Sequence, residues 1–455
     1  MANNDSVLIP YVIQEGSFWY VAYKEKAPVP EVVVSSKGVA NGLSEEYNDG
    51  WDFGPDSYDP NSTASVPYTQ TSGIQEALDY IAQFWQIFQG SAMPELHLLN
   101  QRYSIYTDLV FPPVTNAQIS TWSIVGQGRF NSEITLENGC VNGLDYSNLQ
   151  PYQGSGANIT LRGFTIRANA SNITTHVNAV LPTGSGNNEF TWDDMQIAGN
   201  STYGVDVGNI QEVTIGYTDN ADVNSSSGYF TFEGVIDTVN MYNQSAFGII
   251  SVNCSTLNRF SFRSIFSDVA IIFNQPVNIV ELEGENHNQI TYQGSANMKM
   301  IKLHNYIFIS PTISSPFYVN TGYTPYVIVD GFVYNIPSGT VDFFDLGSSG
   351  VQPNYISIKN VLNVGTGTIT IPSSTPATPS VPASATALTN PNPYPVKAYV
   401  QGGAVTEIQI TIGSNTYTVY SNSTASAVYE GFTLPAGASI TLTYSTAPTW
   451  SWVPE

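Results

Sequence analysis

The sequence predicts an all-β protein whose main body is a right-handed parallel β-helix, and a repeated pattern carries that prediction. Ten segments follow the order apolar, variable, apolar, variable, turn residue, apolar, except that the sixth residue is polar at Gln127, Thr218 and Glu285, and they start at intervals of about 17 to 37 residues. A variable period of this length is typical of coils stacked in a solenoid, with insertions looping out between them. The fifth position is Gly, Asp, Ser or Asn in nine of the ten rows. Most of these residues accept a left-handed or tightly turned backbone, so each row is expected to end at a corner of the coil.

A second pattern appears when the rows are aligned. They begin at Trp122, Ile159, Phe190, Val213, Phe230, Phe260, Val280, Ile301, Val327 and Ile356. The fourth position of a row should point outward, because successive side chains alternate across a strand. At this position the potential charges alternate in sign through Glu233, Arg263, Glu283, His304, Asp330 and Lys359. Coils stacked at about 4.8 Å would turn this series into an external ladder of opposite charges. The second position is Ser or Thr in seven rows, which predicts a neighbouring column of hydroxyl groups.

The elements before the β-helix are an extended segment and one helix. Residues 1–67 are rich in Pro, Gly, Asp and Tyr, with a brief strand-like run at 31–35. We expect this segment to anchor the protein or to clasp a neighbouring subunit. Residues 72–89 have a helical apolar period, a capping-box spacing between Ser72 and Gln75, and Gly90 placed to end the helix. A β-helix has open ends that would otherwise meet water, so this helix is expected to cap the first coil of a domain spanning 68–368.

Two further segments follow the β-helix. Residues 369–393 are rich in Pro, Ser, Thr and Ala and are expected to form a linker. Residues 394–455 alternate between apolar and polar side chains in runs such as AVTEIQITIG and ASITLTYS. This alternation predicts a small antiparallel β-sandwich as the C-terminal module.

The composition excludes several functions. Charged residues make up only 11% of the 455, and 13 basic against 36 acidic residues give a net charge of -23. Binding to nucleic acid or to anionic membranes is therefore not expected. No run of 18 apolar residues exists, and the first residues lack the features of a signal peptide, so direct membrane insertion is not expected either. Cys140 and Cys254 fit buried apolar positions better than a disulfide framework. The four histidines, His97, His176, His287 and His304, show no metal-ligand spacing, and no cofactor is expected.

The start of the predicted β-helix carries a resemblance to a known family. The run PELHLLNQRYSIYTDLVFP, followed by WSIVGQGRF with Gly126 and Gly128, resembles the opening of pectin-lyase-like proteins. In that family a capping helix precedes the first coil, and a strand closes on a Gly-x-Gly turn. The resemblance implies the fold over about residues 70–365. It does not imply one function, because this fold hosts lyases, hydrolases and non-catalytic spikes.

The flanking segments carry a sharper resemblance. NDGWDFGPDSYDP and PYTQTSGIQEALDYIA look like segments in surface proteins of viruses that infect thermoacidophilic archaea, and the C-terminal 60 residues are similar to terminal β-modules of viral tail and adsorption proteins. The resemblance implies a spike, turret or tail-fibre protein at the virion surface that mediates host attachment. Its partners would be a host cell-surface glycan or glycoprotein and other virion proteins. Such spikes usually form homo-oligomers, with a trimer as the first expectation and a pentamer as the second.

Two alternatives to attachment stay open: a glycan depolymerase and a purely structural coat or fibre subunit. Glycoside hydrolases use paired carboxylates. The adjacent acidic pair in the rows is Asp193 and Asp194, with Asp206 and Glu233 as possible partners from neighbouring coils. Asp193 and Asp194 are better explained as ladder and turn residues, so the favoured interpretation is not an enzyme. For attachment, the candidate binding residues are the aromatics Tyr229, Phe232, Tyr242, Tyr318, Tyr323 and Tyr326, which have Asn and Gln nearby.

Two other kinds of site are suggested by spacing alone. Asp49, Asp52, Asp56 and Asp59 could supply oxygen ligands to a hard cation, although an Asp-rich turn is the favoured interpretation. Among the N-x-S/T sequences, Asn169, Asn172, Asn200 and Asn224 fall between rows and are the candidate glycosylation sites.

Overall fold

The computed structural model describes residues 7–15, 18–26, 31–34, 53, 69–87, 93–112, 120–149, 157–183, 188–221, 228–245, 247–286, 288–293, 300–309, 315–319, 326–345, 355–370, 378–390, 395–435 and 437–454. The chain divides into two compact units. The first comprises Met1–Gln352 and Ser357–Pro372, and the second comprises Pro353–Ile356 and Ser373–Glu455. Each unit is described separately below.

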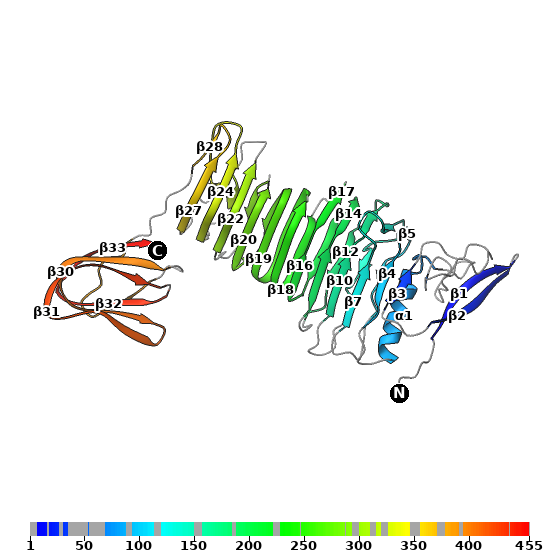
Figure 1. The fold of residues 1–455 in the computed structure, drawn as a ribbon, viewed down its shortest axis with the longest axis horizontal. Coiled ribbons are helices and arrows are strands. Elements are labelled where there is room, and N and C mark those ends of the chain that lie inside the picture. Colours follow the sequence, from blue (N-terminus) through cyan, green and yellow to red (C-terminus); the bar gives the residue numbers. More distant parts are fainter. Residues whose placement is uncertain are drawn as a thin grey trace. The chain divides into compact units, whose positions relative to one another are not determined.

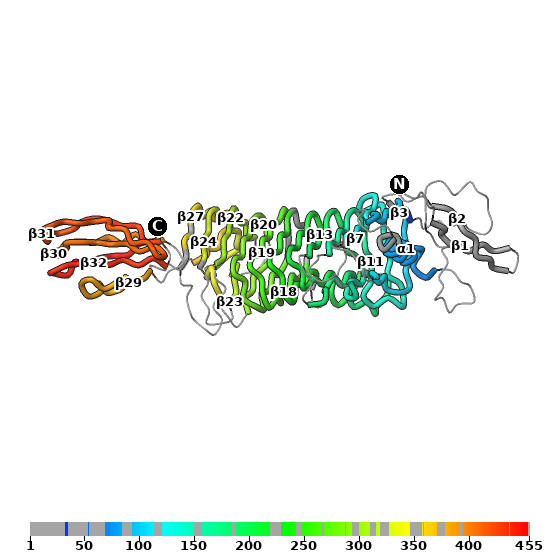
Figure 2. Tube along the Cα trace, turned by 90° about the horizontal axis from the view of Figure 1, so that it is seen from below, coloured from blue at the N-terminus to red at the C-terminus, as the bar shows by residue number. Residues whose placement is uncertain are grey.

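The first unit is a parallel β-helix, as the sequence predicts (Figures 1 and 2). Its strands stack on three faces. Face A consists of β4 (Glu95–Leu98), β7 (Ser120–Val125), β10 (Ala157–Arg162), β13 (Glu189–Asp193), β16 (Glu212–Ile215), the later parts of β18 (Gly228–Ser245) and β19 (Phe247–Phe273), β20 (Ile279–Asn286), β22 (Met300–Ile309), β24 (Tyr326–Asn335) and β27 (Tyr355–Asn363). Face B consists of β5 (Arg102–Ile105), β8 (Glu133–Leu136), β11 (Thr165–Ala168), β14 (Met195–Gly199) and β17 (Thr218–Ala221).

Face C closes each coil. It consists of β6 (Leu109–Val110), β9 (Leu144–Asp145), β12 (Thr175–Val180), β15 (Tyr203–Gly208), the first part of β18, the first and last parts of β19, β21 (Ile290–Tyr292), β23 (Phe317–Val319) and β26 (Phe344–Asp345). A further parallel pair, β25 (Thr340–Asp342) with β28 (Thr368–Thr370), belongs to the last coils. The long strands β18 and β19 run around corners, where the register of their pairing shifts, and each contributes to more than one face.

The core of the β-helix is a set of stacked apolar columns. Ile159 lies in register between Trp122 and Phe190, and Leu161 lies between Ile124 and Trp192. All six side chains are buried. Parallel stacking puts equivalent residues of successive coils in contact, so each coil covers the apolar edge of the one before it. Burial of this apolar surface is the main term that stabilises the stack.

The predicted corners are confirmed by the backbone. Residues at the fifth position of the rows have positive φ at Gly163, Asp194, Gly284, Asn305, Gly331 and Asn360. Gly284 shows why the position is restrictive: its φ is 88°, and a Cβ there would lie 1.9 Å from the carbonyl oxygen of Ser264. Only a residue without a side chain fits that contact.

One predicted row is wrong. Phe230 pairs with Val205 and Ile250 on face C, and the residue that continues the face A column between Val213 and Phe260 is Val239. Glu233 therefore does not belong to the charge ladder. The segment Phe230–Gly234 has the same alternation and the same positive-φ glycine, because the corner from face C to face A uses the same geometry as the corner from face A to face B. The sequence pattern alone cannot distinguish these two corners.

The N-terminal end of the β-helix carries the predicted helix, α1 (Ile74–Ile87), and an additional strand. β3 (Glu31–Val34), within the expected strand-like run, pairs in parallel with β4 and extends face A by one strand. The predicted capping box is wrong. The side chain of Thr71 accepts a hydrogen bond from the Gln75 amide, whereas Ser72 has φ 54° and donates to the backbone of Ser104. The side chain of Gln75 instead bonds both backbone groups of Val110, which ties the helix to face C. Further towards the N-terminus, β1 (Val7–Glu15) and β2 (Phe18–Lys26) form an antiparallel hairpin.

The second unit is a five-stranded antiparallel sheet. Its strands are β29 (Ala387–Thr389), β30 (Val396–Ile412), β31 (Asn415–Leu434), β32 (Ser439–Thr446) and β33 (Thr449–Pro454). β30 pairs with β33 before Gly402 and with β32 after Gly403, and both glycines have positive φ. The predicted all-β C-terminal module is confirmed. The expected linker is shorter than 369–393, because residues 378–390 pack on this sheet. Trp450 and Tyr444 donate to the carbonyl oxygens of Pro379 and Pro382.

Two smaller expectations also have outcomes. Cys140 and Cys254 are fully buried free thiols, as expected, and burial raises the pKa of each to about 12. Within the ranges described above, no helix is both long and apolar enough to span a membrane.

Candidate functional site

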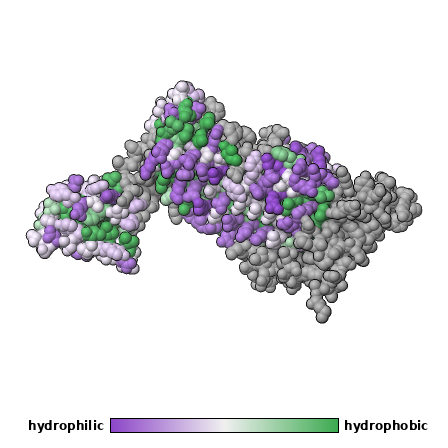
Figure 3. Space-filling view, viewed as in Figure 1, coloured by the Kyte–Doolittle hydropathy of each residue, from purple (hydrophilic) through white to green (hydrophobic). Residues whose placement is uncertain are grey.

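A groove with a volume of about 710 Å³ lies on the outer surface of face A, between β16 and β24. It is lined by residues of six successive strands, most of them outward-facing; Met241, Phe262, Leu282 and Leu303 are buried core residues. The lining comprises Thr214, Asn240, Met241, Tyr242, Arg259, Ser261, Phe262, Arg263, Glu281, Leu282, Glu283, Lys302, Leu303, His304, Ile328 and Asp330. The volume lies within the range of small-molecule sites in proteins. On the side of the first unit shown in Figure 3, hydrophilic residues predominate over the middle of the β-helix.

Strand register arranges the polar lining residues in two parallel files. The middle file contains Thr214, Asn240, Ser261, Glu281, Lys302 and Ile328 in register. The outer file contains Arg263, Glu283, His304 and Asp330 in register, and the preceding outward position on β18 is Tyr242. The predicted vertical order is therefore confirmed for these four residues. The groove is a regular product of the coil repeat, and its side chains stand on a rigid sheet.

Glu281 organises the centre of the groove. Its carboxylate pairs with Arg259 on one neighbouring strand and lies 3.1 Å from Lys302 Nζ on the other. Burial alone would raise the pKa of Glu281, but the hydrogen bonds and positive charges of Lys302 and Arg259 outweigh it and hold that pKa below its usual value. Glu281 is consequently ionised over a wide pH range and fixes both cations in place.

The outer file leaves one cation accessible. Arg263 Nε is 3.7 Å from Glu283 Oε2, and the Arg263 side chain is 62% exposed. The N–H groups of the Arg263 guanidinium are therefore not held in a close contact with Glu283. Further along the file, Asp330 Oδ1 accepts a hydrogen bond of 3.0 Å from the amide of Asn360. The file thus presents a cation and two carboxylates at the spacing of the coil.

An aromatic side chain stands at the end of the groove near β16. Tyr242 is 39% exposed, and burial together with the negative charge of Asp193 raises its pKa. The residue between them in the stack is Gly216, where a Cβ would lie 2.1 Å from Asp193 Oδ1. Because Gly216 has no side chain, the Asp193 carboxylate occupies that space and accepts a hydrogen bond from the Tyr217 amide. Asp193 is therefore a neighbour of the groove with a structural role.

The three catalytic candidates do not form one site. Asp194 occupies a corner with φ 49° and pairs with Arg129, whose guanidinium carbon lies 4.3 Å from the centre of the Tyr217 ring. Asp206 lies on face C, in register with Asn178 and Thr231, and not beside Asp193 on face A. Burial first, and the charge of Glu233 second, raise the pKa of Asp206 to about 7.

The aromatic candidates for binding separate into three groups. Phe232 and Tyr229 are buried at 0% and 1% exposure, so the prediction that they bind a ligand at the surface is wrong. Phe232 faces the core because its position on β18 is an inward one, where its ring lies 6.0 Å from that of Phe230. Tyr242 lines the groove, and Tyr318 is half-buried on face C. Tyr326 pairs in the backbone with Met300, and Tyr323 lies outside the described residues.

The remaining candidates are distributed over loops. Asn169, Asn172 and Asn200 are exposed, whereas Asn224 lies outside the described residues. The candidate cation ligands Asp49, Asp52, Asp56 and Asp59 also lie outside them. Within the described ranges, no group of three or more His, Cys, Asp or Glu side chains is arranged to hold a metal ion.

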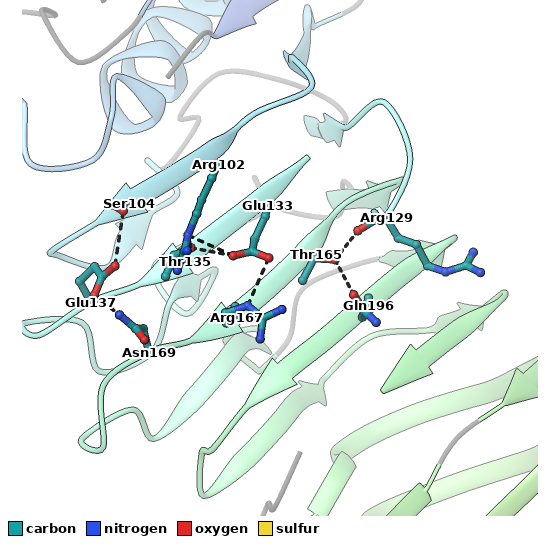
Figure 4. A network of polar contacts seen from close by, with 10 residues as sticks. All are labelled: Arg102, Ser104, Arg129, Glu133, Thr135, Glu137, Thr165, Arg167, Asn169 and Gln196. Atoms are coloured by element: carbon teal, nitrogen blue, oxygen red, sulfur yellow. Dashed lines mark hydrogen bonds and ion pairs between the residues drawn. The ribbon is translucent and has the colours of Figure 1, made fainter. Parts of the chain in front are cut away.

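Face B carries a second polar network, shown in Figure 4. Glu133 lies 3.2 Å from Arg102 on the preceding strand and 3.2 Å from Arg167 on the following one, and Thr135 donates to it as well. Glu137 accepts a hydrogen bond of 2.7 Å from the Asn169 amide. These groups satisfy one another between neighbouring coils. The network therefore fits a role in holding the coils together rather than in binding a ligand.

Sequence reasoning missed three residues of the groove: Arg259, Glu281 and Lys302. Glu281 and Lys302 occupy the second position of their rows, which the rule of alternation also places outside. Arg259 lies directly before the Phe260 row, on the same outward side. Reading all outward positions of neighbouring rows together would have found the cluster. The charge ladder considered only the fourth position.

Comparisons with known proteins do not assign this chain to a group. Its sequence matches no model of a known protein family, and no curated protein matches it.

Proposed function

We propose that this protein mediates attachment of a virus to its host, and that the groove on face A binds a host cell-surface glycan. The observation that carries the glycan part is the groove itself, with its aromatic end at Tyr242 and its ordered series of donors and acceptors. Sugar rings stack on aromatic faces, while carboxylates, amides and guanidinium groups bind their hydroxyls. A groove built across successive coils of equal spacing suits a ligand that is itself a chain of repeated units.

The virion part of the proposal is supported by the resemblance of the flanking segments to viral surface and adsorption proteins. The architecture is consistent with it, because a stack of coils with a separate antiparallel unit is a form that projecting proteins use. A low content of charged residues also suits an exterior that must keep its solvation as pH changes.

A binding experiment tests the proposal. Purified full-length protein and two variants, Tyr242→Ala and Arg263→Ala, are measured for binding to host cells and to glycans released from them. Arg162→Ala is the matched control, since Arg162 is an exposed arginine on face A that does not line the groove. We expect each groove variant to lose at least about tenfold in affinity, as for the removal of one stacked ring or one charged hydrogen bond. The control variant should bind like the unmodified chain.

The same experiment distinguishes the two alternatives. If the protein is a depolymerase, reducing ends appear in the reaction, and Asp206→Asn abolishes their release while Tyr242→Ala only weakens it. If it is a structural subunit, it assembles normally and binds neither cells nor glycans. Binding that survives both groove variants would contradict the glycan site.

A further inference from the structure

The outer surface of face C holds a pair of carboxyl groups that the proposed glycan groove does not use. Asp206 is in register with Asn178 on the preceding coil and with Thr231 on the following coil. Asp206 Oδ1 and Thr231 Oγ1 are both buried without a hydrogen-bond partner, and Thr231 is only 3% exposed. Two neighbouring polar atoms, Asp206 Oδ1 and Thr231 Oγ1, are thus removed from water. Burying such atoms costs free energy unless a proton or a charge nearby satisfies them.

Glu233 completes the pair. It lies two residues after Thr231 on the same side of β18, in register with Gly208 of β15. A Cβ on Gly208 would lie 3.1 Å from Glu233 Cγ, so the Glu233 side chain extends over the glycine towards the strand that carries Asp206. The two carboxyl groups therefore come from adjacent coils and occupy diagonal positions of the β15–β18 pair, where the charge of Glu233 acts on Asp206.

No neighbouring cation offsets this pair among the described residues in register with it. Those residues are Asn178, Thr231, Gly208 and Asn253. On the face C parts of the elements packed around them, the titratable groups are His176 on β12, Asp145 on β9, Tyr203 on β15, Tyr229 on β18 and Cys254 on β19. The His176 ring forms hydrogen bonds with the Ala198 carbonyl oxygen and the Ser201 hydroxyl. The Asp145 carboxylate accepts a hydrogen bond from the side-chain amide of Asn178. None of these groups can neutralise two carboxylates at neutral pH.

We propose that a proton held by Asp206, beside the Glu233 carboxylate, acts as a pH-dependent lock between the neighbouring strands β15 and β18 of the β-helix. When the proton is present, one protonated carboxyl can donate to the other carboxylate or to Thr231, and the pair carries one negative charge. When solvent removes the proton at higher pH, two half-buried carboxylates repel each other across adjacent coils, and the step loosens. The lock is independent of the glycan groove, which lies on another face.

The direction of the effect follows from the titration. Burial and Glu233 raise the pKa of Asp206 from 3.8 to about 7. A group whose pKa is raised in the folded state contributes stability that is complete below the unfolded pKa and is lost as the pH rises through the folded one. Between pH 5 and pH 8 these two pKa values correspond to a fall of about tenfold to about a hundredfold in the equilibrium protection of the β15 and β18 backbone amides against hydrogen exchange.

Hydrogen exchange on the full-length chain tests the lock. Protection factors, corrected for the intrinsic exchange rate, are measured by mass spectrometry at pH 5 and pH 8 for peptides that cover β15 and β18. In the unmodified protein we expect protection to fall by at least about tenfold between these pH values, while peptides that cover β22 on face A change far less. Asp206→Asn should remove the difference, and Glu233→Gln should reduce it. Glu283→Gln, a carboxylate beside Arg263 on face A, is the control and should leave it intact.

Two outcomes would overturn the proposal. One is equal protection of β15 and β18 at both pH values in the unmodified protein. The other is an undiminished difference in Asp206→Asn or, should that variant not fold, in Glu233→Gln. Because the readout is exchange and not binding, failure here would leave the glycan proposal standing, and failure of glycan binding would leave the lock standing.

Discussion

His176 on β12 gives a quantitative prediction about acid stability. Its side chain is 0% exposed, and its Nε2 donates to the Ala198 carbonyl oxygen over 2.9 Å. The other ring nitrogen, Nδ1, lies 3.0 Å from the Ser201 hydroxyl, whose one proton can be donated either to Nδ1 or to the Tyr203 carbonyl oxygen 2.7 Å away; donation to Nδ1 leaves the ring neutral. This arrangement suits the neutral ring. Burial lowers the pKa of His176 from 6.5 to about 4, although its two backbone hydrogen bonds partly oppose the shift.

The sign and the size of the effect can be worked out. Because the folded pKa lies below the unfolded one, His176 contributes stability that is complete above pH 6.5 and is lost as the pH falls through 4. The difference between 6.5 and about 4, at about 1.36 kcal/mol for each pKa unit, amounts to about 3 kcal/mol. This is a large part of the stability of a typical domain.

The perturbation is His176→Gln, which keeps a donor and an acceptor but cannot be protonated. Urea unfolding, followed by circular dichroism, gives the free energy of unfolding of both proteins at pH 7 and pH 4 at one ionic strength. The glutamine changes packing by an amount that is the same at both pH values and cancels in the comparison. The difference between the two proteins should therefore shift by about 3 kcal/mol in favour of the variant between pH 7 and pH 4.

The control is His304→Gln, at an exposed histidine on face A, which should show a much smaller shift. A difference between His176→Gln and the unmodified protein that stays constant from pH 7 to pH 4 would refute the reasoning. It would mean that the buried ring takes up its proton as readily as the unfolded chain does.

Three further predictions concern other parts of the β-helix. Gly284→Ala should lower the free energy of unfolding by more than about 2 kcal/mol, because the new Cβ would meet the Ser264 backbone at a positive φ. Thermal denaturation measures the effect, and Gly437→Ala is the control with a smaller expected effect, because Gly437 also has positive φ but no atom near its Cβ position. Glu281→Gln should weaken glycan binding, because Arg259 and Lys302 lose the carboxylate that holds them in place. The free energy of unfolding should fall by at most about 1 kcal/mol for each partly exposed ion pair lost, and both quantities are measured on the same preparation. Cys140 and Cys254 should resist alkylation by iodoacetamide in the folded protein and react after denaturation, because burial raises the pKa of both thiols; rapid labelling under native conditions would contradict their burial.

The β-helix could be predicted because its strongest restrictions are local and repeat. Inward residues such as Ile159 and Leu161 must be apolar, and corner residues such as Gly163 and Gly331 must accept positive φ. Both restrictions apply to every coil, so they produce a repeated pattern that can be recognised in a single sequence. The four confirmed members of the outer file follow from the same alternation, since an outward position is fixed once its inward neighbours are known.

What could not be predicted depends on which face a segment occupies. The Phe230 segment satisfies the pattern of a face A row and yet lies on face C, because two corners of the coil share one backbone geometry. That ambiguity moved Glu233 into the wrong column. Phe232 holds an inward position of its row on either face, so its choice as a surface aromatic conflicted with the alternation itself. The N-terminal cap failed for a similar reason. Gln75 has the spacing of a capping box, but a tertiary contact with Val110 uses its amide instead.

The separation of faces has a consequence for the chemistry of the whole β-helix. Asn209 and Gly234, both with positive φ, turn the chain between face C and face A, so that outward side chains on the two sides of the corner diverge. The titrating pair Asp206 and Glu233 therefore lies on one surface and the groove file of Thr214 and Asn240 on another, although only a few residues separate them along the chain. Charge on face C then reaches the groove mainly through water or through the rigid stack, and both paths weaken it. A pH change that loosens the β15–β18 step should leave glycan affinity almost unchanged until the coils themselves open, whereas coupling through a shared surface would make the two titrate together.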